Sequence, residues 1–557
     1  MPSYRKLAMR ALGRPLHTER DNKSPRPASQ RAAAFILTAA MLTTLAAPAF
    51  AATWRIEDGD ITVKAGETEG TNKVSQGTNK DVVDTNTIIT NENKDTASSH
   101  TVTIETNDKN DKVEVTLKDV NIDVSKQSKA AVSVTGSGNT TIKLDGDNHL
   151  TGGISDNGSY GLSGISSSGS LTISGGETDS LTAQGGSGTD GSGGRGIFSK
   201  DLTISGGTVN ANGGDGKNGS GGSGITSLGS LTISGGTVNA AGGDGTNSSD
   251  GGDGITNNRG VTISSGGTVT AKGGSGEDGG RGISSFGGVT ISSGGTVTAT
   301  GGNSTGSDGS GGNGISSTST TISGGTVTAN GGSGNSSGGN GIRSFDVAIS
   351  GGTVTANGGS GSYRGGSGIS SSDIELSGSL ELTAKAGSPN GKALSQNGSE
   401  LDPNTFKEKL DPGAKVTTTD ADGKVIKQVS IPRPVEPEKP VIPEESSSSS
   451  DSSSAAPSAP VSSIPGLTVT DKDGQRISYT STQSGNTLTV CVGRFTASFR
   501  ISLAALRQLR AEGIETITFQ TILCSTTLSV DELLAMGGED AEVVLTHRLT
   551  DSSLTVG

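Results

Sequence analysis

Hydrophobic and polar positions alternate along two short segments that recur through the middle of the chain. In LTISGGTVNA, which begins at Leu202, leucine and isoleucine alternate with polar residues, and valine and alanine do the same after two glycines. A period of two residues is typical of a β-strand with one buried face. The pattern therefore predicts a strand, a glycine corner and a second strand.

A third apolar position, an isoleucine after glycine, sets the period of these segments. Gly-Ile recurs at steps of 27 to 32 residues, with the isoleucine at Ile165, Ile197, Ile225, Ile255, Ile283, Ile315, Ile342 and Ile369. One such unit has too few apolar side chains to fold alone, so the units must stack with isoleucine over isoleucine and valine over valine. The sequence predicts a mainly β protein, a parallel β-helix (solenoid) of about 29-residue coils.

Changes in composition divide the chain into six regions. A basic segment, an apolar stretch and an A-x-A sequence predict a signal peptide at residues 1–51, cleaved after Ala51. An N-terminal cap and the first coils are expected at residues 52–150, glycine-rich coils at 151–390 and a transitional β segment at 391–429. A Pro/Ser-rich linker at 430–465 precedes a small α+β domain at 466–557, in which Ser502 and Ser529 begin short helices.

The net charge of the exported part limits the classes of partner that it is expected to bind. Residues 1–51 hold eight Lys and Arg and two Asp and Glu, so 35 of 43 basic and 54 of 56 acidic residues remain, a net charge of −19. Nucleic acid and anionic membranes bind clustered positive charge, so neither is expected as a partner. No other segment is long and apolar enough to span a bilayer. The expected location is extracellular, either secreted or associated with the cell surface.

Two cysteines, Cys491 and Cys524, both lie in the last domain. In an exported chain they can form one disulfide. Two buried free thiols are the alternative.

Residue patterns typical of catalysis are missing from the sequence. There is no HExxH and no Cys-His arrangement, and the exported histidines His100, His149 and His547 lie in different contexts. The chain is therefore not expected to be an enzyme. The catalytic alternative is a calcium-dependent polysaccharide lyase, because such β-helices use clustered acidic residues.

Aspartates recur in the glycine-rich loops and are candidate ligand-binding residues. If these loops share one edge, their carboxylates form a row that could bind Ca²⁺ or face a sugar chain. The alternative is that Asp-Gly serves turns and solubility. Two loops match the first six positions of the calcium-binding nonapeptide GGxGxDxUx, which makes Asp190 and Asp278 candidate calcium ligands; no other cofactor is expected. The candidates are Asp190, Asp215, Asp244, Asp253, Asp278 and Asp308.

Aromatic side chains are the second set of candidate ligand-binding residues, because sugar rings stack on exposed aromatic rings. Phe198, Phe286 and Phe345 each follow a Gly-Ile by one to three residues, so they are predicted to gather at a shared corner, and Tyr363 lies in a loop. The alternative is that these rings fill a corner of the core.

The TISGGTVTA segments, the Gly-Gly-x-Gly-Ile junctions and TIKLDGDNHLTGG from Thr141 resemble the glycine-rich β-helix repeat proteins of gut Firmicutes named as carbohydrate-binding domain-containing, over residues 52–390. The resemblance implies a pectate-lyase-like solenoid that binds a plant or host polysaccharide, with Ca²⁺ as a candidate cofactor. Many relatives have Gly-Ala-Gly-Ile at the junction, where this chain has Ser, Asp, Asn or Arg.

Together these features predict an exported, non-catalytic polysaccharide-binding protein that uses a side of the β-helix. The alternative is a structural or adhesive surface protein in which the β-helix is a spacer and the last domain makes the contact.

Overall fold

The computed structural model describes residues 52–433, except residue 293, and residues 466–556 with gaps at 472–474, 478, 485, 493, 495, 522–524, 536–540 and 549–550. The predicted signal peptide with its cleavage after Ala51, and nearly all of the predicted linker, lie outside the described residues. The chain divides into two units, residues 1–434 and 435–557, and each is described by itself.

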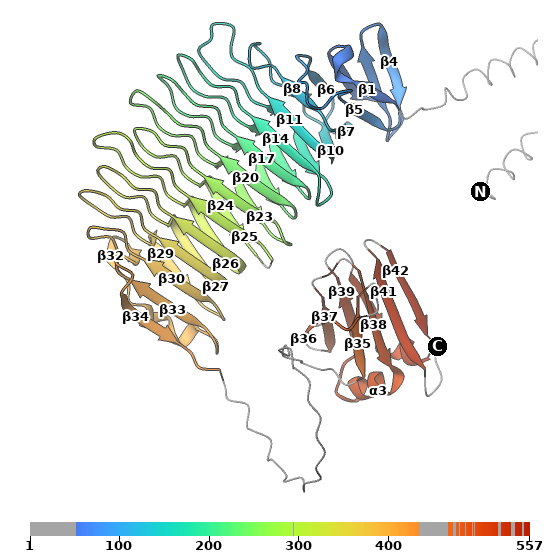
Figure 1. Ribbon diagram of the computed structural model, residues 1–557. Helices are drawn as coiled ribbons and strands as arrows, with labels where there is room; N and C mark the ends of the chain where they lie inside the picture. The colour runs from blue at the N-terminus through green and yellow to red at the C-terminus, as the bar shows by residue number, and fades with distance from the viewer. Residues whose placement is uncertain are drawn as a thin grey trace, which may run out of the picture. The chain divides into compact units, whose positions relative to one another are not determined.

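The first unit is a parallel β-solenoid of about 14 turns of roughly 29 residues (Figure 1). This confirms the predicted mainly β fold. Each regular turn contributes three short strands, and each strand pairs in parallel with the equivalent strands of the turns before and after it. The solenoid therefore has three faces, A, B and C, joined by corners and loops.

Face A is built from the strands that follow Gly-Ile and their N-terminal equivalents. Ile197 pairs with Ile165 on one side and with Ile225 on the other, and all three are fully buried. Its members are β2 (Ile61–Ala65), β6 (Val102–Thr106), β9 (Val132–Gly136), β12 (Ile165–Ser167), β15 (Ile197–Ser199), β18 (Ile225–Ser227), β21 (Ile255–Asn257), the first parts of β24 (Ile283–Ile291), β26 (Ile315–Asn330) and β27 (Ile342–Asn357), β28 (Ile369–Ser371) and β31 (Leu394–Gln396).

Face B is built from the LTI strands. Leu202 pairs with Leu231, and both are buried. Besides later parts of β24, β26 and β27, its members are β1 (Thr53–Arg55), β5 (Thr87–Thr90), β7 (Lys112–Lys118), β10 (Asn139–Asp145), β13 (Ser170–Ser174), β16 (Asp201–Ile204), β19 (Ser230–Ile233), β22 (Gly260–Ile263) and β29 (Asp373–Leu376).

Face C is built from the TVTA strands. Val209 pairs with Val238 in the interior. Besides the ends of β26 and β27, its members are β8 (Asn121–Asp123), β11 (Asp147–Thr151), β14 (Ser180–Gln184), β17 (Thr208–Asn212), β20 (Thr237–Ala241), β23 (Thr268–Lys272), β25 (Thr296–Thr300), β30 (Glu381–Lys385) and β33 (Lys415–Thr419).

Glycine makes both the corner and the return loop of each coil. At the corner between faces B and C, Gly207 and Gly236 have φ of 75° and 72°, a left-handed conformation that favours glycine. In the loops, glycines of successive coils pack backbone against backbone, so that a Cβ on Gly222 would lie 1.9 Å from the carbonyl oxygen of Gly194. The loops can stack as closely as the strands only because these positions lack side chains.

Both ends of the solenoid depart from the repeat. At the N-terminal end, η1 (Ile56–Asp58) and an antiparallel hairpin of β3 (Asn72–Gln76) and β4 (Asn79–Asp84) lie beside the first coil, and Trp54 Nε1 donates a hydrogen bond of 2.9 Å to Asp84 Oδ2. At the other end, β31 and β33 continue the parallel stack. There β32 (Ser399–Glu400), η2 (Pro403–Lys409) and β34 (Val425–Ser430) close the unit, with β34 antiparallel to β33.

The second unit is a small domain of two sheets and two short helices. One sheet contains β35 (Leu467–Thr470), β38 (Thr496–Ser502), β41 (Glu542–Arg548) and β42 (Asp551–Val556); the other contains β36 (Thr480–Ser484), β37 (Thr487–Cys491), β39 (Thr516–Gln520) and β40 (Ser525–Ser529). The helices are α3 (Leu503–Ala511) and α4 (Val530–Ala535). Ser502 caps α3 by accepting the amide of Ala505 at 3.2 Å, which confirms the predicted helix start.

Candidate functional site

A groove follows the solenoid where the glycine-rich loops return to face A. In most coils that carry Gly-Ile, it is lined at up to three positions: the residue five before the isoleucine (the outer position), the residue two before it (the junction position) and the residue after it (the face A position). In the coil of Ile197 these are Ser192, Arg195 and Phe198. We call this feature the junction groove. Because the coils stack in register, equivalent side chains recur along it at about 4.8 Å.

Three hollows lie along the junction groove. The first has a volume of about 650 Å³ and is lined by residues from Asp60 to Phe198, and the second, of about 380 Å³, adjoins it at Arg195 and Gly161. The third, of about 430 Å³, is lined by residues from Asp278 to Ser370. The groove thus offers hollows to a ligand that extends across several coils.

Aromatic and cationic side chains meet in the first two hollows. Tyr160, at an outer position, is 56% exposed, and Phe198 is half-buried on β15. The guanidinium carbon of Arg195 lies 5.2 Å from the centroid of the Phe198 ring, within range of a cation–π contact. Burial lowers the pKa of Arg195, but an arginine remains charged at any physiological pH.

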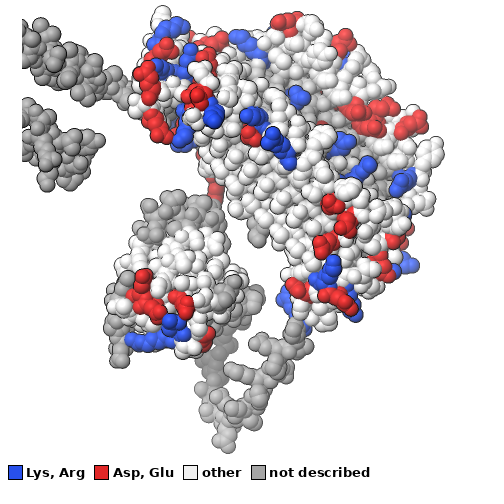
Figure 2. Space-filling view, turned by 180° about the vertical axis from the view of Figure 1, so that it is seen from behind, with Lys and Arg blue, Asp and Glu red and all other residues white. Residues whose placement is uncertain are grey.

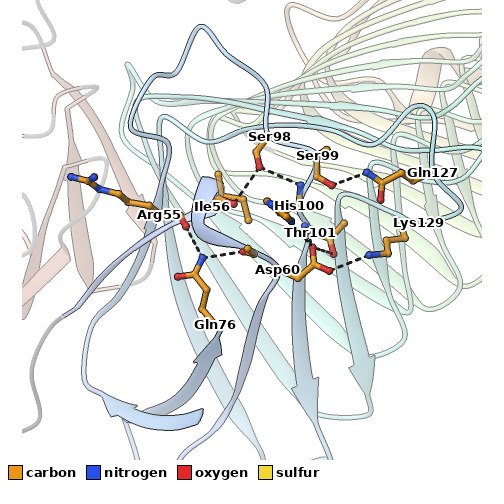
Figure 3. A network of polar contacts seen from close by, with 11 residues as sticks. Arg55, Ile56, Asp60, Gln76, Ser98, Ser99, His100, Thr101, Gln127 and Lys129 are labelled. Atoms are coloured by element: carbon orange, nitrogen blue, oxygen red, sulfur yellow. Dashed lines mark hydrogen bonds and ion pairs between the residues drawn. The ribbon is translucent and has the colours of Figure 1, made fainter. Parts of the chain in front are cut away.

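A polar network lies at the N-terminal end of the groove, where Asp60, Thr101 and Lys129 line the first hollow (Figure 3). Asp60, just before β2, accepts the amide of Thr101 at 2.8 Å, and Lys129 Nζ lies 3.1 Å from its other carboxylate oxygen. His100 Nδ1 is 3.5 Å from Asp60 Oδ1. Burial raises the pKa of Asp60, but hydrogen bonds from Thr101 and Lys129 and the charge of Lys129 outweigh it, so this pKa lies below its usual value. Three successive coils supply these residues.

The structure does not bring the six predicted aspartates into one row. Asp215 and Asp244 share a column, because Asp244 N donates to Asp215 Oδ1 at 2.9 Å. Asp253 occupies a junction position and Asp278 an outer position of the groove. Asp190 instead accepts a hydrogen bond of 2.7 Å from Asn218, and Asp308 is exposed in its loop. Asp215 and Asp244 share a column because each directly follows the Gly-Gly pair after face C, whereas the other four lie at other places in their loops.

Several of these carboxylates bind the backbone of the next coil. Asp244 Oδ1 accepts the amide of Ser275 at 2.7 Å, and Asp253 Oδ1 accepts the amide of Arg281 at 2.7 Å. Burial raises the pKa of Asp253, although the hydrogen bonds and the charge of Arg281 oppose this effect. Through these hydrogen bonds, Asp244 and Asp253 connect neighbouring coils.

No group of three or more His, Cys, Asp and Glu side chains suited to a metal ion occurs among the described residues. Calcium binding at Asp190 and Asp278 therefore stays a prediction. The described part of the chain also contains no helix with the length and hydropathy needed to cross a membrane.

Of the predicted aromatic residues, two share a corner. Phe286 and Phe345, 74% and 63% exposed, lie where face A turns into face B, and Thr318 of the intervening coil donates a hydrogen bond of 2.6 Å to the carbonyl of Phe286. Phe198 lies on face A instead, and Tyr363 is a loop residue, 75% exposed. Because they are exposed, Phe286 and Phe345 do not fill the core.

Most charged residues of the groove were not predicted from the sequence. Arg195 and Arg281 occupy junction positions, Arg343 a face A position and Arg364 an outer position. Alignment of the coils on their Gly-Ile pairs would have revealed these positions, since each of these arginines lies five or two residues before an isoleucine or directly after one.

In the second unit, the Cys491 thiol lies 3.5 Å from Gln520 Oε1, and burial raises its pKa. Cys524 lies outside the described residues, so the disulfide between the two cysteines stays a prediction.

Comparisons with family models, curated proteins and solved structures find no match to this chain. The site is therefore interpreted from its own residues.

Proposed function

We propose that this is an exported, non-catalytic polysaccharide-binding protein whose ligand lies along the junction groove. The observation that supports this most is the recurrence of equivalent lining positions in several coils of each hollow. A repeating surface suits a repeating polymer, because each sugar can meet an equivalent set of groups. Export rests on the predicted signal peptide at residues 1–51.

The N-terminal hollows carry the groups that sugars require. Tyr160 and Phe198 offer ring surfaces on which the C–H face of a pyranose can stack. Hydroxyl groups beside them can exchange hydrogen bonds with sugar hydroxyls, and Asp60 and Lys129 supply a charged acceptor and donor. The hydroxyl residues of this hollow are Thr62, Thr101, Thr103, Ser128, Ser133, Ser163 and Ser166.

A glycan array of neutral and acidic polysaccharides, followed by calorimetric titration of the best ligands, tests the proposal on the full chain. The double variant Tyr160→Ala/Phe198→Ala removes both groove rings and should weaken binding about tenfold or more, since each stacked ring contributes roughly 0.5–1.5 kcal/mol beyond its buried area. Phe286→Ala is the matched control, because it removes an exposed ring outside these hollows and should leave affinity unchanged. Retention of no glycan by the wild-type chain, or equal losses in both variants, would contradict the proposal.

The second candidate is a structural or adhesive protein with the solenoid as spacer. It is favoured by one outer column of face B that carries no charge over its middle coils, where Thr203, Thr232 and Thr262 stack in register. Figure 2 likewise shows acidic and basic side chains intermixed around the N-terminal coils, while wide stretches of the solenoid surface carry no charge. Adhesion that persists in Tyr160→Ala/Phe198→Ala, without binding to any glycan, would support the spacer.

A further inference from the structure

The third hollow of the junction groove is basic although the protein is acidic. The chain has a net charge of −13. In contrast, Arg281, Arg343 and Arg364 all line this hollow of about 430 Å³, and Asp278 is its one acidic lining residue. A local excess of guanidinium groups inside a groove points to an anionic ligand.

These arginines are only weakly neutralised by the protein. The carboxylate nearest to Arg281 belongs to Asp253, with 3.9 Å between Nη1 and Oδ2, and the Asp253 side chain is only 15% exposed. Within residues 52–433 and the described parts of 466–556, no ion pair involves Arg343 or Arg364. Asp278 is itself engaged, since its Oδ1 accepts the amide of Ser310 at 2.6 Å. At least two guanidinium groups are therefore available to a ligand.

The lining residues come from four successive coils. Asn313 and Asn340 follow Arg281 at the junction position, and Asn340 Nδ2 donates to Asn313 Oδ1 at 3.0 Å. Arg343 lies on the same coil as Asn340, and Arg364 lies on the next. At about 4.8 Å per coil the hollow is roughly 15 Å long. This length suits an extended polymer with anionic groups at intervals better than it suits one small anion.

We propose that the third hollow binds the carboxylate or sulfate groups of an acidic polysaccharide. This inference rests on the proposed function and specifies its ligand class. Arginine presents a planar fork of N–H donors that matches the two oxygens of such a group, and the amides of Asn313 and Asn340 can bond to sugar hydroxyls between the charges. Nucleic acid is a poorer fit, because it attracts a broad positive surface and this protein is acidic overall.

The test uses the full chain with three probes: polygalacturonate, its fully methyl-esterified form and chondroitin sulfate. We expect the methyl ester, which lacks the charges, to bind about tenfold or more weakly than polygalacturonate, and the comparison with chondroitin sulfate separates carboxylate from sulfate recognition. Arg343→Ala/Arg364→Ala should weaken binding of the preferred acidic chain about tenfold or more and flatten its salt dependence. Arg343→Lys/Arg364→Lys, which retains charge without the fork, should fall between the two.

Arg259→Ala is the matched control, because it removes an exposed arginine that does not line the hollow. Trp54 fluorescence during denaturation checks that the solenoid of each variant remains folded. Two results together would overturn this inference and leave the proposed function standing. Arg343→Ala/Arg364→Ala would bind the acidic polysaccharides as tightly as the wild type does, and Tyr160→Ala/Phe198→Ala would lose glycan binding. Absence of glycan binding by the wild-type chain would remove both. Equally tight binding of free phosphate or of a DNA duplex would overturn the polysaccharide assignment.

Discussion

The solenoid and the C-terminal domain form their hydrophobic cores from different kinds of side chain. The solenoid stacks small aliphatic side chains of the same type over one another, as in the columns of Ile197, Leu202 and Val209. The C-terminal domain instead packs two large rings, Phe499 and Phe519, with centroids 4.9 Å apart and both side chains buried. In one unit the stabilisation is distributed over many equivalent contacts, and in the other it is concentrated in a few large residues.

This difference changes where each unit is sensitive to substitution. A solenoid coil contacts mainly its two neighbours, so its stability is close to a sum over coils and interfaces. The solenoid tolerates substitutions least in the glycine loops, because the backbones of neighbouring coils are in direct contact there. The domain has a single core, and loss of one large side chain affects all of it.

The largest effect is expected from Phe499→Ala in the C-terminal domain. Removal of this buried ring leaves a cavity beside Phe519 and should lower the free energy of unfolding of the domain by about 3–5 kcal/mol. Amide hydrogen exchange in β38 and β41 reports the domain, while fluorescence of Trp54 reports the solenoid. A shift of the Trp54 transition as large as that of the domain would contradict the separation of the two cores.

A smaller, local effect is expected from Gly332→Ala in a glycine loop. The added Cβ would lie 1.9 Å from the carbonyl oxygen of Gly302, so the backbone of neighbouring coils must shift, at a cost of roughly 1–3 kcal/mol. Gly260→Ala is the control, because its Cβ would meet only an ordinary contact at 3.6 Å. Thermal unfolding monitored by circular dichroism compares the two. Equal stability of both variants would disprove the steric role of the loop glycines.

The smallest effect is expected from pH, through a buried histidine of the C-terminal domain. His547 is fully buried, its Nε2 lies 3.0 Å from Thr526 Oγ1, and its Nδ1 has no hydrogen-bond partner among the described residues. Burial lowers its pKa below 6.5. Below about pH 6.5, His547 is therefore protonated more readily in the unfolded chain than in the folded domain. The free energy of unfolding of the domain accordingly decreases as the pH falls through 6.5 and below. The His547→Gln variant should flatten this dependence in denaturant titrations at pH 7.5 and pH 5.5; an unchanged slope would exclude His547 as its cause.

The fold of the solenoid could be predicted because its signal repeats. Alternation in LTISGGTVNA gives the buried side of each strand, and the Gly-Ile period gives the stacking. The antiparallel hairpin of β3 and β4 was not predicted, because alternation identifies a strand but not its neighbour. Strand pairing is equally hard to predict at the other end of the solenoid, where the repeat also stops.

The candidate site was harder to predict than the fold. The aspartates were grouped by their presence in the loops, yet Asp215 lies just after face C and Asp253 just before face A, so the two belong to different columns. Arg281, Arg343 and Arg364 occupy three different positions of the coil, so no motif repeats among them. They come together only because stacking places neighbouring columns side by side.

In the glycine-rich return loops, the hydrogen bonds from backbone amides to side chains of the neighbouring coil all run the same way along the chain. Asp215 accepts the amide of Asp244, Asp244 accepts that of Ser275, and Asn313 accepts that of Asn340. In these loops, each coil thus presents side-chain acceptors to the coil synthesised after it. When the chain emerges N-terminus first, the acceptors for each new return loop are therefore already present on the preceding coil.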